Sequence, residues 1–486
     1  MKVAPIEIKE VGIIKEVRKG IVKISGMGSC IYGGILQFQS GIKGMIIGFN
    51  DTEVMALVLG EETEIHLGDK VWTEAEVLKI GVGDGLIGKI VNSLGVVVEG
   101  QEKVDCKEYN PIFREAAGVM DRVPIHRQLQ TGIKILDAVI PIGKGQRELI
   151  IGDRVTGKST IALDTIINQR DKGVICIYCW VGGGNAGFSR IISLLKERDA
   201  FDYSLVVASP ASASPAEQYL APYTAATIGE YFMYKGRDVF VVFDDLTKHA
   251  WIWRELSLLM KRSPGREAYP GDIFYLHSQL MERAANLSPE NGGGSMTFFP
   301  IVETQQGDVT GYIPSNLVSM TDGQIYLSSN LFREGFRPAI DLTLSVSRIG
   351  SKVQPDALKE VSSRLRLEYS QYNELLRLTR LKTRVSSEFS EKLKRGQTLC
   401  DLLRQGAHQS VSFEEEVIIF YAFKRNILEI LPEESLKKFM QGIYPFLLTH
   451  IPQVLKQIRQ EKTLSSSIKE QLDKAFIVFF KQEKII

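Results

Sequence analysis

The sequence lacks the features of several protein classes. None of its apolar runs approaches the roughly 18 residues that a membrane-spanning helix requires. Charge of one sign is not in excess, because 59 Lys and Arg residues are balanced by 58 Asp and Glu residues. This balance argues against a protein whose main task is to coat nucleic acid or an anionic membrane. Cysteine is scarce, with five scattered residues, which excludes a disulfide scaffold and favours a reducing compartment.

What is present indicates a globular chain of several domains. The apolar share is 44% and the charged share is 24%, both typical of soluble globular proteins. A chain of 486 residues is too long for one hydrophobic core and suggests roughly three domains. The composition changes near residues 74 and 356. We therefore expect domains over residues 1–74, 75–356 and 357–486.

The two ends of the chain have opposite compositions. Residues 1–74 hold eleven glycines among short apolar runs, which predicts short strands and tight turns in a small β-barrel. Residues 357–486 hold only three glycines and three prolines. Apolar residues recur there at three- and four-residue spacing from Leu358 to Leu376, which predicts an amphipathic helix. We expect this part to be an α-helical bundle.

The middle of the chain alternates between strand-like and helical segments. Its continuous apolar runs, typical of parallel strands buried on both faces, lie at residues 148–151, 174–181, 205–207 and 239–243. A loop and a mixed segment follow each run, which favours an α/β sheet. The second run contains Cys176 and Cys179 in C-x-x-C spacing. Because redox pairs of this spacing open a helix, we interpret both cysteines as core residues.

A phosphate-binding motif follows the first of these strands. Residues 152–159 (GDRVTGKS) match G-x-x-x-x-G-K-[ST] in full, between a predicted strand and a predicted helix. The glycines let backbone N–H groups surround phosphates, and the helix N-terminus adds partial positive charge. We expect Lys158 to contact the β- and γ-phosphates and the Ser159 hydroxyl to ligate Mg²⁺.

A P-loop site also needs an acid at the end of a neighbouring strand. Asp244 directly follows the apolar run 239–243, and we expect it to hold Mg²⁺ through water. Asp245 is better explained as an N-cap or as a partner of Lys248. The loop and Asp244 together predict a site for ATP or ADP with Mg²⁺.

The acid that hydrolysis requires is missing. Cleavage of the γ-phosphate needs a polar group, often a carboxylate, that orients the attacking water. In ring-shaped proteins of this fold, that acid follows the strand after the P-loop helix. Here the position holds residues 182–187 (GGGNAG), and no acid occurs between Asp171 and Glu197. We therefore expect a site that binds nucleotide without cleaving it.

Four segments resemble the α subunits of F-type ATP synthases. They lie at residues 145–154, 243–248, 264–277 and 345–350, and the likeness extends from about residue 10 to the C-terminus. The resemblance implies a multidomain protein with an N-terminal β-barrel crown, a central RecA-like P-loop α/β domain and a C-terminal α-helical bundle.

The resemblance also implies a function. The α subunits of this family alternate with catalytic β subunits in a hexameric ring around a γ stalk, and they bind Mg-ATP without turning it over. The complex couples ATP synthesis or hydrolysis to ion transport, such as proton transport, at the cytoplasmic face of the bacterial inner membrane. Arg348 matches the arginine that α presents in trans to the β catalytic site. Little or no turnover is expected from the isolated chain.

The motif and the resemblance together define a predicted nucleotide site. Its residues are Gly152, Asp153, Arg154, Val155, Thr156, Gly157, Lys158, Ser159, Thr160, Asp244, Phe332, Arg337, Pro338 and Gln405. Phe332, Arg337 and Pro338 match residues that line the adenine pocket, and Gln405 matches a glutamine that contacts the base. An ordinary core or surface role remains open for Phe332 and Gln405.

Several positions depart from the family pattern. Val155 stands where the loop usually carries glutamine, residues 183–185 replace a Gln-Lys-Arg or Gln-Lys-Ala run, and Ala407 replaces a second base-contacting glutamine. These changes weaken the expectation of tight or ATP-specific binding. Family members also carry a longer N-terminal helix that docks the δ subunit of the peripheral stalk. Because residues 7–12 lead almost directly into the first strand here, we expect a divergent form whose stalk attaches differently.

Other classes of protein share the P-loop. A homohexameric ATPase of protein export or a Rho-like helicase would need its own water-orienting glutamate after residue 181, which this chain lacks. A helicase would also need basic and aromatic RNA contacts in its first domain, and residues 1–74 show no basic stripe. A purely structural ring spacer with a decayed site is opposed by the intact Lys158, Ser159 and Asp244.

Overall fold

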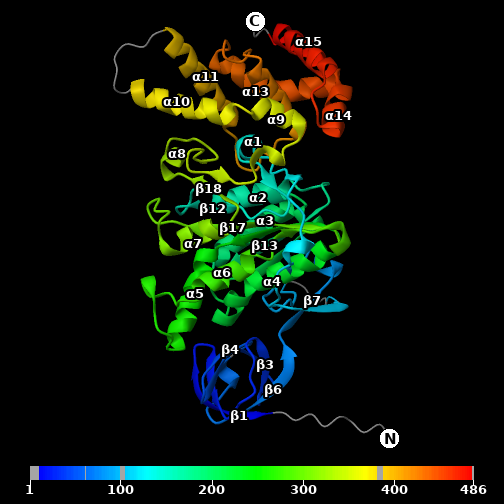
Figure 1. The fold of residues 1–486 in the computed structure, drawn as a ribbon. Coiled ribbons are helices and arrows are strands. Elements are labelled where there is room, and N and C mark those ends of the chain that lie inside the picture. Colours follow the sequence, from blue (N-terminus) through cyan, green and yellow to red (C-terminus); the bar gives the residue numbers. More distant parts are fainter. Residues whose placement is uncertain (1–9, 61, 99–103, 105, 380–386, 484–486) are drawn as a thin grey trace. The chain divides into compact units, whose positions relative to one another are not determined.

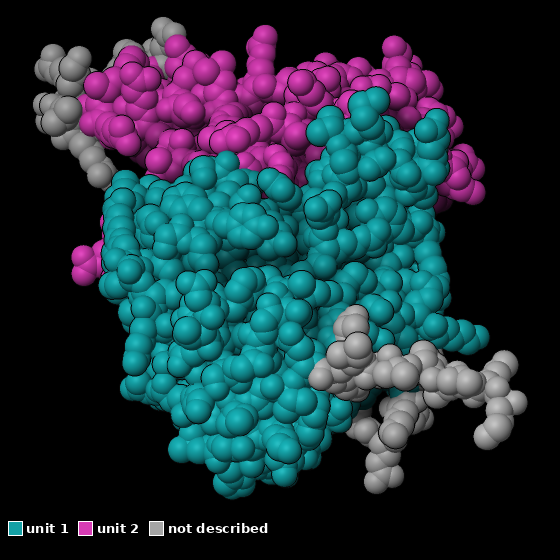
Figure 2. All heavy atoms as spheres, turned by 60° about the horizontal axis from the view of Figure 1, so that its bottom comes forward, with its two compact units in different colours: residues 1–123, 171–303, 309–320 teal, residues 124–170, 304–308, 321–486 magenta. Residues whose placement is uncertain are grey.

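The computed structural model divides the chain into two compact units (Figure 2). The residues that it describes are 10–60, 62–98, 104, 106–379 and 387–483. The first unit comprises residues 1–123, 171–303 and 309–320, and the second unit comprises residues 124–170, 304–308 and 321–486. The expectation about stalk attachment rests on residues 7–12, of which residues 7–9 lie outside the described residues. No helix in the described part of the chain is long and apolar enough to cross a membrane.

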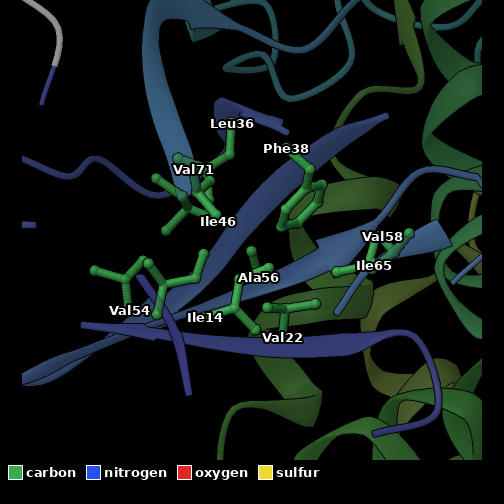
Figure 3. Packing of buried hydrophobic residues seen from close by; sticks show 11 residues of the cluster. Ile14, Val22, Leu36, Phe38, Ile46, Val54, Ala56, Val58, Ile65 and Val71 are labelled. Atoms are coloured by element: carbon green, nitrogen blue, oxygen red, sulfur yellow. The ribbon is translucent and has the colours of Figure 1, made fainter. Parts of the chain in front are cut away.

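A closed barrel of six antiparallel strands forms one part of the first unit, in the order β1-β2-β5-β4-β3-β6 (Figure 1). The strands are β1 (Val11–Arg18), β2 (Ile21–Ser25), β3 (Gly34–Phe38), β4 (Lys43–Phe49), β5 (Glu53–Val58) and β6 (Lys70–Val77). Apolar side chains fill the barrel, among them Ile14, Leu36, Phe38 and Val71 (Figure 3). The predicted barrel is confirmed, and its last strand extends beyond residue 74.

A parallel sheet forms the other part of the first unit, in the order β17-β15-β13-β14-β8. Its strands are β8 (Ile90–Val91), β13 (Val174–Val181), β14 (Ser204–Ser209), β15 (Asp238–Asp244) and β17 (Ser295–Glu303). Three short strands pair outside this order: β7 (Lys79–Val82) with β9 (Glu108–Pro111), and β16 (Ala285–Asn286) with β17. Every residue of β13 is buried, and Cys176 and Cys179 have no exposed surface. Both cysteines are therefore core residues, as predicted.

The helices of the first unit cover this sheet. They are α3 (Asn185–Glu197), α4 (Pro215–Tyr234), α5 (Leu246–Leu259), α6 (Ile273–Met281) and α7 (Tyr312–Met320). The longest, α4, packs against β13, β14 and β15 and is buried along most of its length. Its Glu230 accepts two hydrogen bonds, of 2.8 and 2.7 Å, from the fully buried guanidinium of Arg283. A buried ion pair of this kind ties α4 to the segment after α6, because removal of either partner would leave an uncompensated charge.

Two buried histidines lie on α5 and α6. His249 Nδ1 is 3.4 Å from His277 Nε2, and neither ring has exposed surface. Burial lowers the pKa of His249 to about 4, although a hydrogen bond to the Tyr219 carbonyl opposes the shift. Burial, with the neighbouring His249, also lowers the pKa of His277 well below its usual value. Both rings are therefore neutral in the folded chain near neutral pH.

We expect the first unit to lose stability as the pH falls below about 6.5. Unfolded histidines bind protons in that range, whereas His249 and His277 stay neutral, so acid favours the unfolded chain. The loss between pH 7 and pH 5 should approach about 2 kcal/mol for each histidine. Urea titrations at several pH values would measure it. The double variant His249→Gln, His277→Gln should show a flatter pH dependence, and an equally steep one would contradict this explanation.

The second unit contains a small sheet in the order β19-β18-β12 and a separate strand pair, β10 with β11. The strands are β10 (Gln128–Leu129), β11 (Ile142–Gly143), β12 (Leu149–Gly152), β18 (Gly323–Leu327) and β19 (Val346–Ser347). The helices that accompany them are α1 (Lys134–Val139), α2 (Lys158–Ile167) and α8 (Ser329–Arg333). All four strands predicted in the middle of the sequence, in both units, are present as β12, β13, β14 and β15.

The end of the chain is helical (Figure 1). Its helices are α9 (Asp356–Ser362), α10 (Leu365–Thr379), α11 (Ser387–Leu403), α12 (Phe413–Lys424), α13 (Glu433–His450), α14 (Pro452–Glu461) and α15 (Ser466–Gln482). The predicted helical bundle is confirmed, but the prediction of one helix from Leu358 to Leu376 is wrong, because a turn separates α9 from α10. Val361 and Leu365 are both buried on either side of this turn. The apolar spacing therefore reports the buried face correctly but not the continuity of the backbone.

Candidate nucleotide site

The phosphate loop connects β12 to α2 in the second unit. All four residues of β12 are buried, and α2 begins at Lys158 with Gly157 as its N-cap. Val155 and Gly157 have φ values of 62° and 99°, in the left-handed region. Such a backbone turns N–H groups into a concavity that binds anions. No side chain of the described chain caps α2, so the partial positive charge at its N-terminus faces the loop.

Lys158 is held inside this loop. Its Nζ donates hydrogen bonds to the carbonyl oxygens of Gly152 and Asp153, at 2.9 and 2.6 Å. Only 7% of the residue's surface is exposed. A buried ammonium beside a ring of N–H groups is a strong attractor for phosphate oxygens.

The remaining loop residues differ in their exposure. Arg154 and Val155 form the exposed tip, where Val155 has 84% of its surface exposed. A β-branched residue rarely adopts a positive φ, and such strain is typical of ligand-binding loops. Thr156 is buried and donates a 2.8 Å hydrogen bond to a carbonyl oxygen of the loop. Ser159 and Thr160 lie half-buried in the first turn of α2.

The Asp153 carboxylate is hydrogen-bonded to groups of the protein itself. It accepts hydrogen bonds from Thr304 Oγ1 at 2.6 Å, from the Gly307 N–H at 2.8 Å and from Ser329 Oγ at 2.7 Å. Burial raises the pKa of this carboxyl, but these hydrogen bonds and the charge of Lys158 outweigh burial and lower it. Asp153 therefore shapes the loop, and Thr304 and Ser329 are supporting residues that no sequence motif marks.

The residues matched to the adenine pocket lie together in the second unit. The Arg337 guanidinium carbon is 4.7 Å from the centre of the Phe332 ring, and the peptide bond between Arg337 and Pro338 is cis. The Gln405 N–H donates a 2.8 Å hydrogen bond to the Arg337 carbonyl. A cation stacked on an aromatic ring offers a flat surface of the kind on which a base can stack.

The side-chain amide of Gln405 is already occupied by backbone groups. Its Oε1 accepts from the Lys134 N–H at 2.9 Å, and its Nε2 donates to the carbonyls of Gly132 and Gln409 at 2.7 and 2.6 Å. These bonds use the amide's donors and leave little capacity for a base. Of the two roles left open by the sequence, the geometry favours a structural one for Gln405.

His408, three residues after Gln405, contacts helix α2. Its Nδ1 lies 2.7 Å from Asp164 Oδ1, and its backbone N–H donates to both oxygens of that carboxylate at 3.1 and 3.2 Å. Asp164 lies on α2, the helix that the phosphate loop opens. No pattern in the sequence marks this pair, because neither residue belongs to a motif and the two are far apart along the chain.

Arg348 directly follows β19 and is exposed. Its backbone N–H donates to the Asp322 carbonyl at 2.8 Å, and the Asp322 carboxylate is held by Arg147 at 2.8 and 3.0 Å. Ser347 Oγ donates to the Pro141 carbonyl at 3.0 Å and accepts from Gln146 Nε2 at 3.1 Å. Within the described chain, no hydrogen bond or ion pair engages the Arg348 guanidinium. A hydrogen-bonded backbone thus presents an exposed charged group at the surface.

Asp244 and Asp245, at the end of β15, belong to the first unit. Asp244 ends the strand and accepts a hydrogen bond from the Tyr178 hydroxyl. Asp245 caps α5 through the Lys248 N–H at 2.8 Å, and its other oxygen lies 2.8 Å from Lys248 Nζ. Burial raises the pKa of Asp245 to about 6, although Lys248 opposes the shift. The interpretation of Asp245 as an N-cap and a partner of Lys248 is confirmed.

The sequence matches known proteins over almost its whole length. Residues 7–72 match the ATP synthase alpha/beta family, beta-barrel domain. Residues 132–347 match the ATP synthase alpha/beta family, nucleotide-binding domain, and residues 354–479 match the ATP synthase alpha/beta chain, C terminal domain. The ATP synthase subunit alpha of Caldanaerobacter subterraneus subsp. tengcongensis is 44% identical over 478 residues, which cover 98% of this chain and 94% of that protein. The chain belongs to the ATP synthase alpha/beta family.

Further relatives in this family are equally similar. The proteins named ATP synthase subunit alpha in two strains of Clostridium botulinum are each 44% identical over 470 residues, covering 97% of this chain and 93% of their own length. The nucleotide-binding domain of the ATP synthase alpha/beta family includes the phosphate loop, Asp244, Phe332 and Arg337 of this chain. Gln405 falls in the match to the family's C-terminal domain.

Proposed function

We propose that this chain is the non-catalytic α subunit of an F-type ATP synthase. In this proposal it binds Mg-ATP or Mg-ADP and supplies Arg348 in trans to the catalytic site of a neighbouring β subunit. The observation that carries the proposal is a complete phosphate loop in a chain whose connection from β13 to α3 contains no carboxylate. Such a site can hold a triphosphate but offers nothing there to orient an attacking water.

The nucleotide would be held by groups of different kinds. Backbone N–H groups of residues 152–160 and the Lys158 ammonium would bind the phosphates. The Ser159 hydroxyl and, through water, the Asp244 carboxylate would complete the coordination of Mg²⁺. Oxygen ligands of this kind suit Mg²⁺, which takes few protein ligands and keeps phosphates and water in its shell. Phe332, Arg337 and Pro338 would line the adenine pocket, and Gln405 would support that pocket through its backbone contacts.

Arg348 would act outside its own chain. Its exposed guanidinium, presented by the Asp322 and Ser347 contacts, could reach a phosphoryl group that is transferred at the β subunit. A planar guanidinium stabilises the charge that develops on such a group in the transition state. The chain would therefore contribute to ATP synthesis and hydrolysis without performing either alone.

The proposed role defines the partners and the location. Copies of the chain would alternate with β subunits in a hexamer around the γ stalk, with a peripheral stalk and δ subunit as further partners. These subunits would hold it as a peripheral protein at the cytoplasmic face of a bacterial inner membrane, where the complex couples nucleotide turnover to ion transport. A subunit with two neighbours needs complementary faces of mixed charge, and 59 basic against 58 acidic residues are consistent with that.

ATP hydrolysis by the purified chain, alone and with its β partner, tests the proposal. We expect nucleotide binding but essentially no turnover by the chain alone, and robust turnover by the complex, because only the complex would combine a water-orienting acid with Arg348. Binding of labelled ATP to the same preparation confirms that the chain is folded. Robust hydrolysis by the isolated chain would instead support a homohexameric motor of the protein-export or Rho-like kind.

A further inference from the structure

A buried carboxyl group lies directly before β12 in the second unit. It belongs to Glu148, which has no exposed surface. Its Oε2 accepts a 2.7 Å hydrogen bond from Gln146 Nε2, and its Oε1 is buried without a hydrogen-bond partner among the described residues. An apolar side chain of the same length would avoid the free-energy cost of removing this carboxyl from water. Stability alone therefore does not explain an acid at this position, and its unpartnered oxygen calls for an explanation.

Glu148 lies across one strand from the segment that carries Arg348. In the small sheet β18 lies between β12 and β19, and Gly323 of β18 pairs with Ser347 of β19. A Cβ atom at Gly323 would lie 2.6 and 2.8 Å from the two carboxyl oxygens of Glu148. It would also lie 2.2 Å from the Val346 carbonyl oxygen. The carboxyl therefore sits beside the strand that Arg348 directly follows, in a space that only glycine leaves open.

The Gln146 side chain joins this carboxyl to that strand. An amide nitrogen has two hydrogens, and Gln146 Nε2 donates to Glu148 Oε2 and, at 3.1 Å, to Ser347 Oγ. Gln146 Oε1 accepts from the Gly143 N–H at 2.7 Å, so all three groups define the orientation of the amide. Without the acceptor on Glu148, one buried hydrogen of the amide would lose its partner, and the amide could turn away from Ser347.

Ser347 in turn restrains the backbone on both sides of Arg348. Its Oγ donates to the Pro141 carbonyl at 3.0 Å and accepts from the Gly350 N–H at 3.2 Å. Because Ser347 precedes the arginine and Gly350 follows it by two residues, this hydroxyl limits the movement of the backbone between them. A shift of Ser347 would therefore move the point from which the Arg348 side chain extends.

The charge of Arg348 also acts on Glu148. Burial raises the pKa of the Glu148 carboxyl well above its usual value, and the charge of Asp322 raises it further. The hydrogen bond from Gln146 and the charge of Arg348 oppose this rise. The buried acid and the exposed arginine are therefore close enough for their charges to interact.

We propose that Glu148 is a positioning residue for Arg348. Its carboxyl fixes the Gln146 amide, the amide holds Ser347, and Ser347 sets the place from which the arginine extends. This inference rests on the proposed function, because it requires that Arg348 acts at the catalytic site of the β subunit. It gives a role to a buried residue outside the phosphate loop, which acts through Arg348 and not on the nucleotide.

Steady-state ATP hydrolysis by the complex of the full chain with its β partner tests the inference. Glu148→Met keeps a side chain of similar length but removes the acceptor, so we expect kcat to fall about ten-fold while KM stays within about two-fold. Glu148→Gln keeps an oxygen that can accept from Gln146, and its kcat should stay within about three-fold of the parent value. Equal kcat values for Glu148→Met and the parent complex would overturn the inference.

A double-variant cycle distinguishes positioning from a general loss of stability. In complexes that already carry Arg348→Ala, Glu148→Met should cause no further loss of rate, because the group that Glu148 positions is gone. Radiolabelled ATP makes the low residual rate measurable. A further loss as large as that in the parent background would show that Glu148 acts independently of Arg348, and it would also overturn the inference.

Glu414→Met is the matched control. Glu414 is another buried acid of the second unit, and its Oε1 accepts hydrogen bonds from Tyr444 at 2.9 Å and from Arg459 at 3.1 Å. Its replacement should lower the unfolding temperature of the chain but leave the kcat of the complex within about two-fold of the parent value. A fall in kcat equal to that of Glu148→Met would contradict a specific role for Glu148.

Arg348→Ala separates this inference from the proposed function. If Arg348→Ala keeps the full rate, the in-trans role fails, and the inference fails with it. If Arg348→Ala loses the rate and Glu148→Met keeps it, only the inference about Glu148 fails. If Glu148→Met does not assemble with β, Ser347→Ala decides, because it removes the hydroxyl that Gln146 holds. It should lower kcat about ten-fold in the parent background but not beside Arg348→Ala, and a full rate would overturn the inference.

Discussion

Arg348→Ala is expected to reduce ATP hydrolysis by the complex of this chain with its β partner about 1,000-fold or more, with assembly intact. The structure gives a physical reason for so large an effect. The Arg348 side chain is exposed and forms no hydrogen bond or ion pair among the described residues, so we expect its removal to leave this chain folded. An arginine that stabilises transferred charge in trans accounts for several orders of magnitude in rate, because its charge is already in position when the transition state forms.

The complex of the variant chain with β would be purified by size and its steady-state hydrolysis compared with that of the parent complex. Arg364→Ala is the matched control, since Arg364 is also an exposed arginine of the second unit and lies in the turn between α9 and α10. It should leave the rate nearly unchanged. Arg348→Lys should recover little activity, because an ammonium lacks the planar fork of donors. A full rate in Arg348→Ala would refute the in-trans role.

Lys158→Gln is expected to weaken the binding of MgATP to the isolated chain by about 100-fold. The substitution keeps a side chain of similar length but removes the charge that lies inside the phosphate loop. In the structure Lys158 Nζ holds the carbonyls of Gly152 and Asp153, so the variant loses both the phosphate contact and part of the loop's support. Charge-assisted hydrogen bonds to phosphate are stronger than neutral ones, and this lysine would make more than one.

Isothermal titration calorimetry on the parent and variant chains would measure the change. Lys359→Gln, at an exposed position on α9, is the control for a general effect of charge and should bind MgATP normally. Thermal unfolding without nucleotide should be similar for all three chains, whereas added MgATP should stabilise only the parent and the control. Tight binding by Lys158→Gln would show that the nucleotide, if bound, occupies another site.

Local patterns predicted much of the fold correctly. The continuous apolar runs at residues 174–181 and 239–243 became β13 and β15, because a fully apolar strand can only be stable when both faces are covered. The glycine-spaced runs before residue 74 became a closed barrel, in which tight turns join short strands. These features depend on neighbouring residues, and their signals are therefore local.

Errors and omissions arose where distant segments interact. The break between α9 and α10 was missed because the buried face continues across the turn, and the spacing of apolar residues records only that face. The support of Asp153 by Thr304 and Ser329 joins three segments that no local pattern connects. The sequence left two roles open for Gln405, and only the folded chain brings near it the backbone groups that bind its amide.

The sequence by itself determined the chemistry that this protein can offer. A full phosphate motif, a strand that ends in Asp244, the absence of acid between Asp171 and Glu197, and the segment around Arg348 are all visible in the order of residues. Near-zero net charge and the lack of long apolar runs were equally plain. Such features are properties of composition and of short spacings, which folding does not alter.

Only the tertiary structure decided which of these groups form hydrogen bonds within the chain and which are exposed at its surface. It placed the Lys158 ammonium inside its loop, satisfied Asp153, and left the Arg348 guanidinium exposed without a partner in the described chain. It also placed the Glu148 carboxyl against Gly323, with one oxygen buried without a partner among the described residues. The physical reason is that hydrogen-bond satisfaction depends on contacts between residues far apart in sequence, and those contacts exist only once the chain has packed.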